Sequence, residues 1–205
     1  MSKIKLFIRE SWLLIVSSFF FGLLLAVTNA AWLPKIEQNK QAEINQLMTY
    51  LLPEAKSFEQ AAEAEIDLGK GKKTKSRIYK ALSAGGQCIG WEFNAEGAGF
   101  ADKIEMIIAV DKNFEKIAGI EFASLNETPG FGDRAKQPYF RNQFAQAPAG
   151  ELNLTKTGDP GKIDSEIVAI TGATVTSTAV VNSANNYIKQ VKEYMLNKGL
   201  IQNVK

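Results

Sequence analysis

The chain has 205 residues with no histidine and one cysteine, and its 24 basic side chains nearly balance its 22 acidic ones. Without histidine there is no imidazole base, no Ser-His-Asp or Cys-His relay and no histidine metal ligand. The single cysteine, Cys88, excludes an internal disulfide and a cysteine-ligated iron–sulfur cluster. The near-zero net charge gives no reason to expect nucleic acid as a partner. We therefore assign no metal ligands, and any redox activity of this chain requires an organic cofactor.

The first element in chain order is an apolar segment, residues 11–33, that contains no charged side chain. As a helix these residues span about 34 Å, enough to cross a hydrocarbon core of about 30 Å. A cleaved signal peptide is the alternative, but the run is too long for its apolar core and the cleavage pattern is poor. Lys3, Lys5 and Arg9 place the amino end in the cytoplasm by the positive-inside rule. We predict that residues 1–33 are a cytoplasmic end and a single-pass anchor in the cell (inner) membrane, with the following domain on the outer or periplasmic face.

Residues 34–75 are predicted to be a helical stem and linker. Pro34 suits the opening of a helix, where its missing N–H has no partner to lose. Apolar residues then recur with helical spacing on one face until Pro53 ends the pattern. They are Ile44, Leu47, Met48, Leu51 and Leu52. Such a stripe indicates a stem that packs on its own domain.

Residues 76–205 are predicted to be one domain of the α+β class. Four short β-rich runs, separated by glycine or Asp-Lys-Asn turns, indicate an antiparallel meander. The runs are residues 77–82, 88–94, 104–111 and 116–123. We then expect a short helix at residues 139–146, short strands at 152–154 and 166–170, and a long helix at 177–197.

The segment that joins the last strand to the long helix, residues 170–177, reads ITGATVTS. Its Gly-Ala pair keeps the backbone approachable, and Thr174, Thr176 and Ser177 offer three hydroxyls at a helix start. Unpaired N–H groups and the helix dipole make such a start a site for an anion, naturally a phosphate. Simple N-capping by one of the hydroxyls needs no ligand and is the simpler explanation on the residues alone. Both explanations stay open at this point.

A second unusual segment, residues 126–134, reads NETPGFGDR. Its Pro-Gly pair favours a type II turn with Gly130 at the position of positive φ. Gly132 permits a second close approach of the backbone. A rigid turn of this kind can present backbone groups to a flat ligand, although most such turns only join elements.

Together the two segments carry a family resemblance. The loop reads E-T-P-G-x-G-D over residues 127–133, and T-G-A-T follows at residues 171–174. In this order, after one anchor, they resemble the G subunits of the Rnf electron-transport complex. They resemble more distantly the C subunit of the sodium-translocating NADH:quinone reductase. Both are members of the FMN-binding domain family, and the resemblance runs over essentially the whole chain.

The resemblance implies that FMN is joined through its phosphate to the hydroxyl of Thr174 by a separate flavin transferase that uses FAD as donor. The N–H groups at the helix start could stabilise the charge that the phosphodiester keeps. The neighbouring motif residues are implied to bind the cofactor, and no residue is assigned a catalytic role. These cofactor-binding residues are Thr171, Gly172, Ala173, Val175, Thr176 and Ser177 around the linkage, and Glu127, Thr128, Pro129 and Gly130 against the flavin.

The function implied is that of a membrane-anchored flavoprotein that relays electrons in an ion-translocating ferredoxin:NAD oxidoreductase, with the other membrane subunits as partners. Turnover would belong to the assembly, because the redox chemistry is the cofactor's. One alternative is a component like the C subunit of the quinone reductase. Another is a membrane-anchored assembly or binding protein without covalent flavin. The latter stays open because the family commonly has an acid three positions before T-G-A-T, where this chain has Val168.

Overall fold

The computed structural model describes residues 3–69 and 71–201. The chain forms two compact units, Met1–Glu43 and Ile44–Lys205. The second unit therefore includes the end of the predicted stem, residues 44–52, which we call the stem end. The sheet, the short elements and the candidate site all belong to this second unit.

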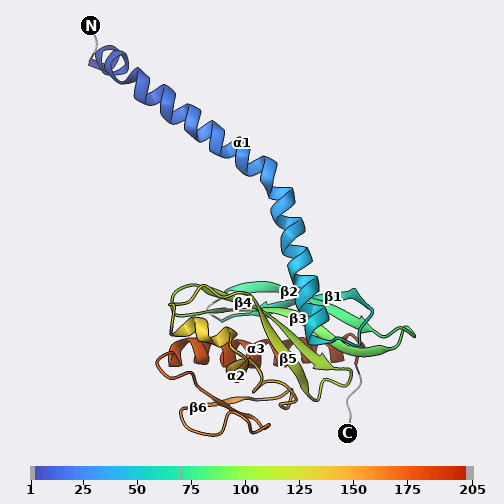
Figure 1. The fold of residues 1–205 in the computed structure, drawn as a ribbon. Helices are drawn as coiled ribbons and strands as arrows, with labels where there is room; N and C mark the ends of the chain where they lie inside the picture. Colours follow the sequence, from blue (N-terminus) through green and yellow to red (C-terminus); the bar gives the residue numbers. More distant parts are fainter. Residues whose placement is uncertain (1–2, 70, 202–205) are drawn as a thin grey trace. The chain divides into compact units, whose positions relative to one another are not determined.

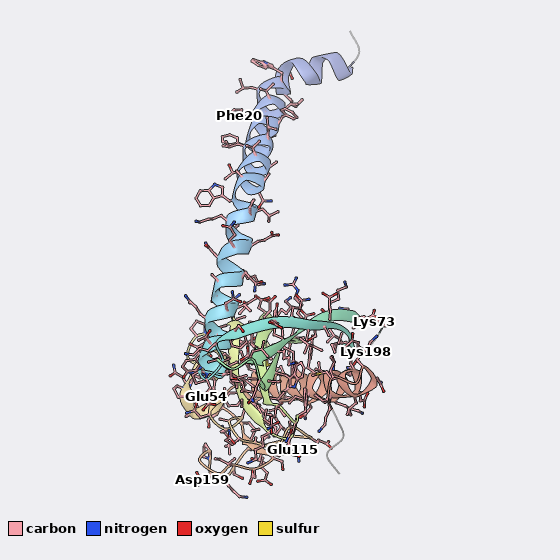
Figure 2. All side chains as sticks on the ribbon, turned by 90° about the vertical axis from the view of Figure 1, so that its right-hand side faces the viewer. Phe20, Glu54, Lys73, Glu115, Asp159 and Lys198 are labelled. Carbon is pink, nitrogen blue, oxygen red and sulfur yellow. The ribbon has the colours of Figure 1, made fainter. Side chains whose placement is uncertain are left out.

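The first helix, α1 (Lys3–Leu51), carries exposed apolar side chains over its first part, and Figure 2 shows Phe20 projecting from it. Within the described residues it is the one helix long and apolar enough to cross a membrane. The helix ends just before Pro53, as predicted. The prediction that Pro34 opens a helix is wrong, because Pro34 lies inside α1. Proline there removes one backbone hydrogen bond from the helix without ending it.

Five antiparallel strands form the main sheet in the order β1-β2-β3-β4-β5, so that each strand pairs with its neighbour in sequence (Figure 1). The strands are β1 (Ser57–Asp67), β2 (Lys73–Leu82), β3 (Cys88–Ala98), β4 (Lys103–Asp111) and β5 (Ile117–Ser124). The predicted α+β class and meander are confirmed. β1 was not predicted and lies in the segment interpreted as linker. Its Ala, Glu and Gln favour helix by propensity, and only Ala64 and Ile66 of this strand are buried.

The two faces of the sheet are covered by different helical segments. Side chains alternate between the faces along each strand. Phe93 of β3 belongs to the main core, which the face shares with α3 (Thr174–Asn197), and Figure 1 shows α3 lying along the sheet. On the opposite face Leu52 of the stem end packs against β3, where a Cβ at Gly90 would lie 3.0 Å from Leu52 Cδ1.

The chain between β5 and α3 folds into short elements that bring the two motifs together. They are the 3-10 helix η1 (Gly132–Lys136), α2 (Pro138–Arg141), and the parallel pair β6 (Asn153–Thr155) and β7 (Glu166–Val168). The helix predicted at residues 139–146 is therefore shorter, and α3 begins at Thr174 rather than at Ser177. Phe140 and Phe144 are fully buried in the main core and hold this segment against the domain.

Candidate functional site

The T-G-A-T segment forms the start of α3. Ala173 is the N-cap residue, Thr174 begins the helix, and no side chain in the described chain caps it. Ser177 fastens the segment from inside: its Oγ donates to the carbonyl of Ala173 and accepts from the N–H of Ile170, both at 3.0 Å. The explanation by simple N-capping is therefore wrong. The N–H groups of the first turn keep the capacity to bind an anion.

Glu127 joins three segments at this site. It is 7% exposed, and its Oε2 accepts a hydrogen bond from Thr176 Oγ1 at 2.8 Å. Its Oε1 accepts from the backbone N–H groups of Phe100 and Ala101 at 2.9 and 3.1 Å. The carboxyl group thus ties the first turn of α3 to the β3–β4 connection and to its own loop. Glu127 and Thr176 were both predicted to bind the cofactor, and in the structure they are hydrogen-bonded to each other.

The β3–β4 connection is fastened to the same loop a second time. Asn126 Nδ2 donates to Asp102 Oδ2 at 3.1 Å, and the N–H of Lys103 donates to Asp102 Oδ1 at 2.7 Å. These two donors, the backbone N–H first, hold the pKa of Asp102 below its ordinary value. The two hydrogen bonds therefore favour the ionised form of Asp102.

The turn predicted from the Pro-Gly pair is present at residues 128–131. The N–H of Phe131 donates to the carbonyl of Thr128 at 3.1 Å, and Gly130 has a φ of +79°, as the third position of a type II turn requires. The residues of the turn before Phe131 are exposed. The ring of Phe131 lies beside Gly172, where a Cβ would be 3.2 Å from Phe131 Cδ1. The turn and the T-G-A-T segment therefore meet at the surface.

Gly132 lets the loop pass close to the Glu127–Thr176 hydrogen bond. A Cβ at Gly132 would lie 2.6 Å from Thr176 Oγ1 and 2.7 Å from Glu127 Oε2. Both distances are too short for a carbon contact, so a side chain here must displace the bonded pair.

We therefore expect Gly132→Ala to lower the free energy of unfolding by about 2 kcal/mol, an overpacking effect. The measurement is chemical denaturation of the purified full chain in detergent, followed by near-UV circular dichroism. Gly150→Ala is the matched control, because nothing lies within 4 Å of a Cβ there. Equal stability of the two variants would contradict the close packing around Gly132.

The residues of the T-G-A-T segment divide into an exposed and a buried set. Thr171, Gly172, Thr174 and Val175 are exposed, whereas Ala173, Thr176 and Ser177 are buried. Thr174 therefore lies at the surface of the domain. Three large apolar side chains are exposed on the segments that meet here: Phe100 at 69%, Phe131 at 53% and Val175 at 57%. An apolar surround with a polar, uncapped helix start suits a flat aromatic ligand that carries a phosphate.

Gln143, which was not among the predicted site residues, fixes the strand leading into the motif. Its Oε1 accepts from the N–H of Val168 at 2.7 Å, and its Nε2 donates to the carbonyl of Val168 at 3.2 Å. Gln143 is 3% exposed, so this amide clamp is internal. Nothing in the local sequence signals it, because the two partners are joined only by the fold. The Val168 side chain packs beside Gly158, where a Cβ would be 3.1 Å from Val168 Cγ2.

Comparison with known proteins places these features in a family. The FMN-binding domain family matches residues 99–189, which include both motifs. The chain is 31% identical to the G subunit of the proton-translocating ferredoxin:NAD+ oxidoreductase complex of Clostridium ljungdahlii over 182 residues, 88% of this chain and 89% of that protein. The chain belongs to the family of these G subunits. The resemblance predicted from the two motifs is therefore confirmed.

A second relative and one solved structure are also similar to this chain. The G subunit of the ion-translocating oxidoreductase complex of Methanosarcina acetivorans is 28% identical over 178 residues, 87% of this chain and 90% of that protein. Among solved structures, NqrC of Shewanella oneidensis is similar with a TM-score of 0.51 and 22% identity, over 69% of this chain and 73% of that one. At that identity the likeness shows a shared fold and no more.

Proposed function

We propose that this chain is a membrane-anchored flavoprotein that carries electrons within an Rnf-type ion-translocating ferredoxin:NAD oxidoreductase complex. One observation carries the proposal: in a protein of this family with an FMN-binding domain, an exposed threonine hydroxyl stands at an uncapped helix start. FMN, when bound, supplies the redox chemistry at its ring. The chain has no histidine and one cysteine, so its own side chains offer no comparable redox group.

The proposed attachment point is the hydroxyl of Thr174, joined to the FMN phosphate by a flavin transferase. Two features support it: Thr174 is exposed, and the N–H groups of the first turn of α3 stabilise a phosphodiester through the helix dipole. The exposed side chains of Phe100, Phe131 and Val175 provide apolar surface for the flavin ring. Glu127 acts as a positioning residue that holds these segments together.

The membrane arrangement is part of the proposal. The apolar, exposed first part of α1 supports a single-pass anchor, and the basic residues before it favour a cytoplasmic amino end. The flavin domain would then face the outside of the membrane, where a covalent bond prevents loss of the cofactor. The other membrane subunits of the complex would be its partners, as the names of its relatives indicate.

The proposal is tested by producing the full chain together with a flavin transferase of this type. We expect a flavin-fluorescent band on a denaturing gel and an intact mass raised by one FMN phosphoester. External protease added to protoplasts should remove the fluorescent band, because the domain faces outward. A dark band at unchanged mass would refute covalent attachment and favour an assembly or binding protein. A protected band would refute the orientation.

A further inference from the structure

A buried carboxyl group lies in the middle of the main sheet, outside the flavin site. Glu92 of β3 is 0% exposed. Neither of its carboxyl oxygens has a hydrogen-bond partner among residues 3–69 and 71–201. Buried polar groups are normally paired, so an unpaired carboxyl of this kind needs a physical reason.

Glu92 lies on the sheet face that the stem end covers. It alternates with Phe93, which points into the core shared with α3, and so faces the other way. In register it lies between Tyr79 of β2 and Ala109 of β4. Three buried apolar residues outside the main core lie next to this position on the same face: Ala109, which pairs with Glu92, and Ala81 and Ile107, which are diagonal to it. Met48 of the stem end and Ala55 are also buried and also lie outside the main core.

Two close contacts place the stem end against the sheet near Glu92. A Cβ at Gly90 would lie 3.0 Å from Leu52 Cδ1, and a Cβ at Gly119 would lie 2.9 Å from Leu51 Cδ2. Gly90 is the neighbour of Glu92 on its own face of β3, and Gly119 pairs with Ala109, which itself pairs with Glu92. The two leucines therefore pack on the sheet at positions next to Glu92, whose carboxyl group is fully buried.

The groups around Glu92 do not compensate a negative charge. The stem end, residues 44–52, contains no charged residue, and its one titratable group is exposed Tyr50. The titratable groups on the same face of the sheet are Glu63, Glu65 and Asp67 from β1, Lys73, Lys75, Arg77 and Tyr79 from β2, Glu92 and Glu96 from β3, Lys103, Glu105 and Asp111 from β4, and Glu121 from β5. The three lysines are each paired with a carboxylate other than Glu92. Arg141 of α2 is bound to Glu121. Burial raises the pKa of Glu92 to about 9, so the carboxyl is neutral at neutral pH while the stem end covers it.

We propose that Glu92 is a proton-controlled latch: in its neutral form it lets the stem end lie on the sheet, and when it ionises the stem end is released while the rest of the domain stays folded. On release the carboxyl O–H bond breaks, the proton passes to solvent water, and water solvates the carboxylate on the uncovered face. This latch operates without FMN. Nine released residues would lengthen the tether before the sheet by up to about 30 Å, so the reach of the domain would depend on the pH around it.

The direction of the pH dependence follows from the raised pKa. Docking binds a proton that the released state gives up, so docking is favoured at low pH. The ratio of docked to released stem is constant below the ordinary pKa of a glutamate. It then falls about tenfold for each pH unit until the pH reaches about 9.

Amide hydrogen exchange of the full chain in detergent micelles, measured from pH 6 to 9 and corrected for intrinsic exchange, tests this. We expect protection of amides 44–52 to fall about tenfold per pH unit, and to lie below that of the β3–β4 amides throughout. Glu92→Gln, which is neutral at every pH, should make stem protection independent of pH. Glu59→Gln makes the same chemical change at an exposed position of β1 and should keep the dependence.

A second variant separates the latch from packing. Leu52→Ala should lower stem protection at every pH by a constant factor and leave the pH slope unchanged. The proposal is overturned if stem and β3–β4 amides have equal protection at each pH, because the stem then opens only when the domain unfolds. It is also overturned if the pH dependence survives in Glu92→Gln.

Discussion

Thr174→Ala is expected to abolish covalent flavin and to leave the domain folded. The phosphoester requires an oxygen at this position, and alanine removes it, so the denatured band should be dark and the intact mass should lack FMN. The side chain of Thr174 is exposed and makes no hydrogen bond within the described chain, so its loss should change the free energy of unfolding by less than about 0.5 kcal/mol. Near-UV circular dichroism of the same sample checks the fold.

The matched control is Thr178→Ala, one turn further along α3. Thr178 carries the same hydroxyl and uses it to donate to the carbonyl of Thr174 at 2.8 Å. This variant should keep its flavin, because the attachment atom is intact. Thr174→Ser should keep at least part of it for the same reason. Fluorescence that persists in Thr174→Ala and disappears in Thr176→Ala would move the attachment site to a residue that the structure buries.

The parts of this fold that could be predicted are those that depend on short local sequence patterns. The meander followed from β-rich runs bounded by turn residues, and the turn at residues 128–131 followed from its Pro-Gly pair. β1 could not be found this way, because its composition favours helix and its strand state comes from pairing along its whole length with β2. Pro34 could not be placed correctly, because a proline that opens a helix and one inside a long helix look alike in sequence.

The motifs of the candidate site could be predicted from the sequence, but the hydrogen bonds that join them could not. The two loops were identified as one site only through the family resemblance, since 49 residues separate the bonded side chains Glu127 and Thr176. The backbone donors at Phe100 and Ala101 carry no side-chain signal at all. The burial of Glu92 could not be predicted either. An acidic residue among β-forming residues suggests an exposed position on a strand, and only the fold shows that the stem end packs on this face.

Glu127→Ala is expected to destabilise the domain by about 3 kcal/mol, more than any exposed substitution near the site. It leaves three donors without their acceptor: the N–H groups of Phe100 and Ala101 and the hydroxyl of Thr176. An unsatisfied buried donor costs about 1 to 3 kcal/mol, and water that enters the new space offsets part of the total. Chemical denaturation of the full chain in detergent measures the loss.

Two further variants decide whether the effect comes from the hydrogen bonds. Glu127→Gln should recover most of the stability, because its amide oxygen accepts from both backbone N–H groups and its NH2 group donates to the Thr176 hydroxyl oxygen. Asn126→Ala removes one exposed hydrogen bond, to Asp102, and should cost under about 1 kcal/mol. If Glu127→Ala were no less stable than Asn126→Ala, the three segments would be held by packing alone. A positioning role also predicts that flavin attached to Glu127→Ala has lower fluorescence anisotropy than flavin attached to Glu127→Gln, since only the alanine variant releases α3 from the β3–β4 connection.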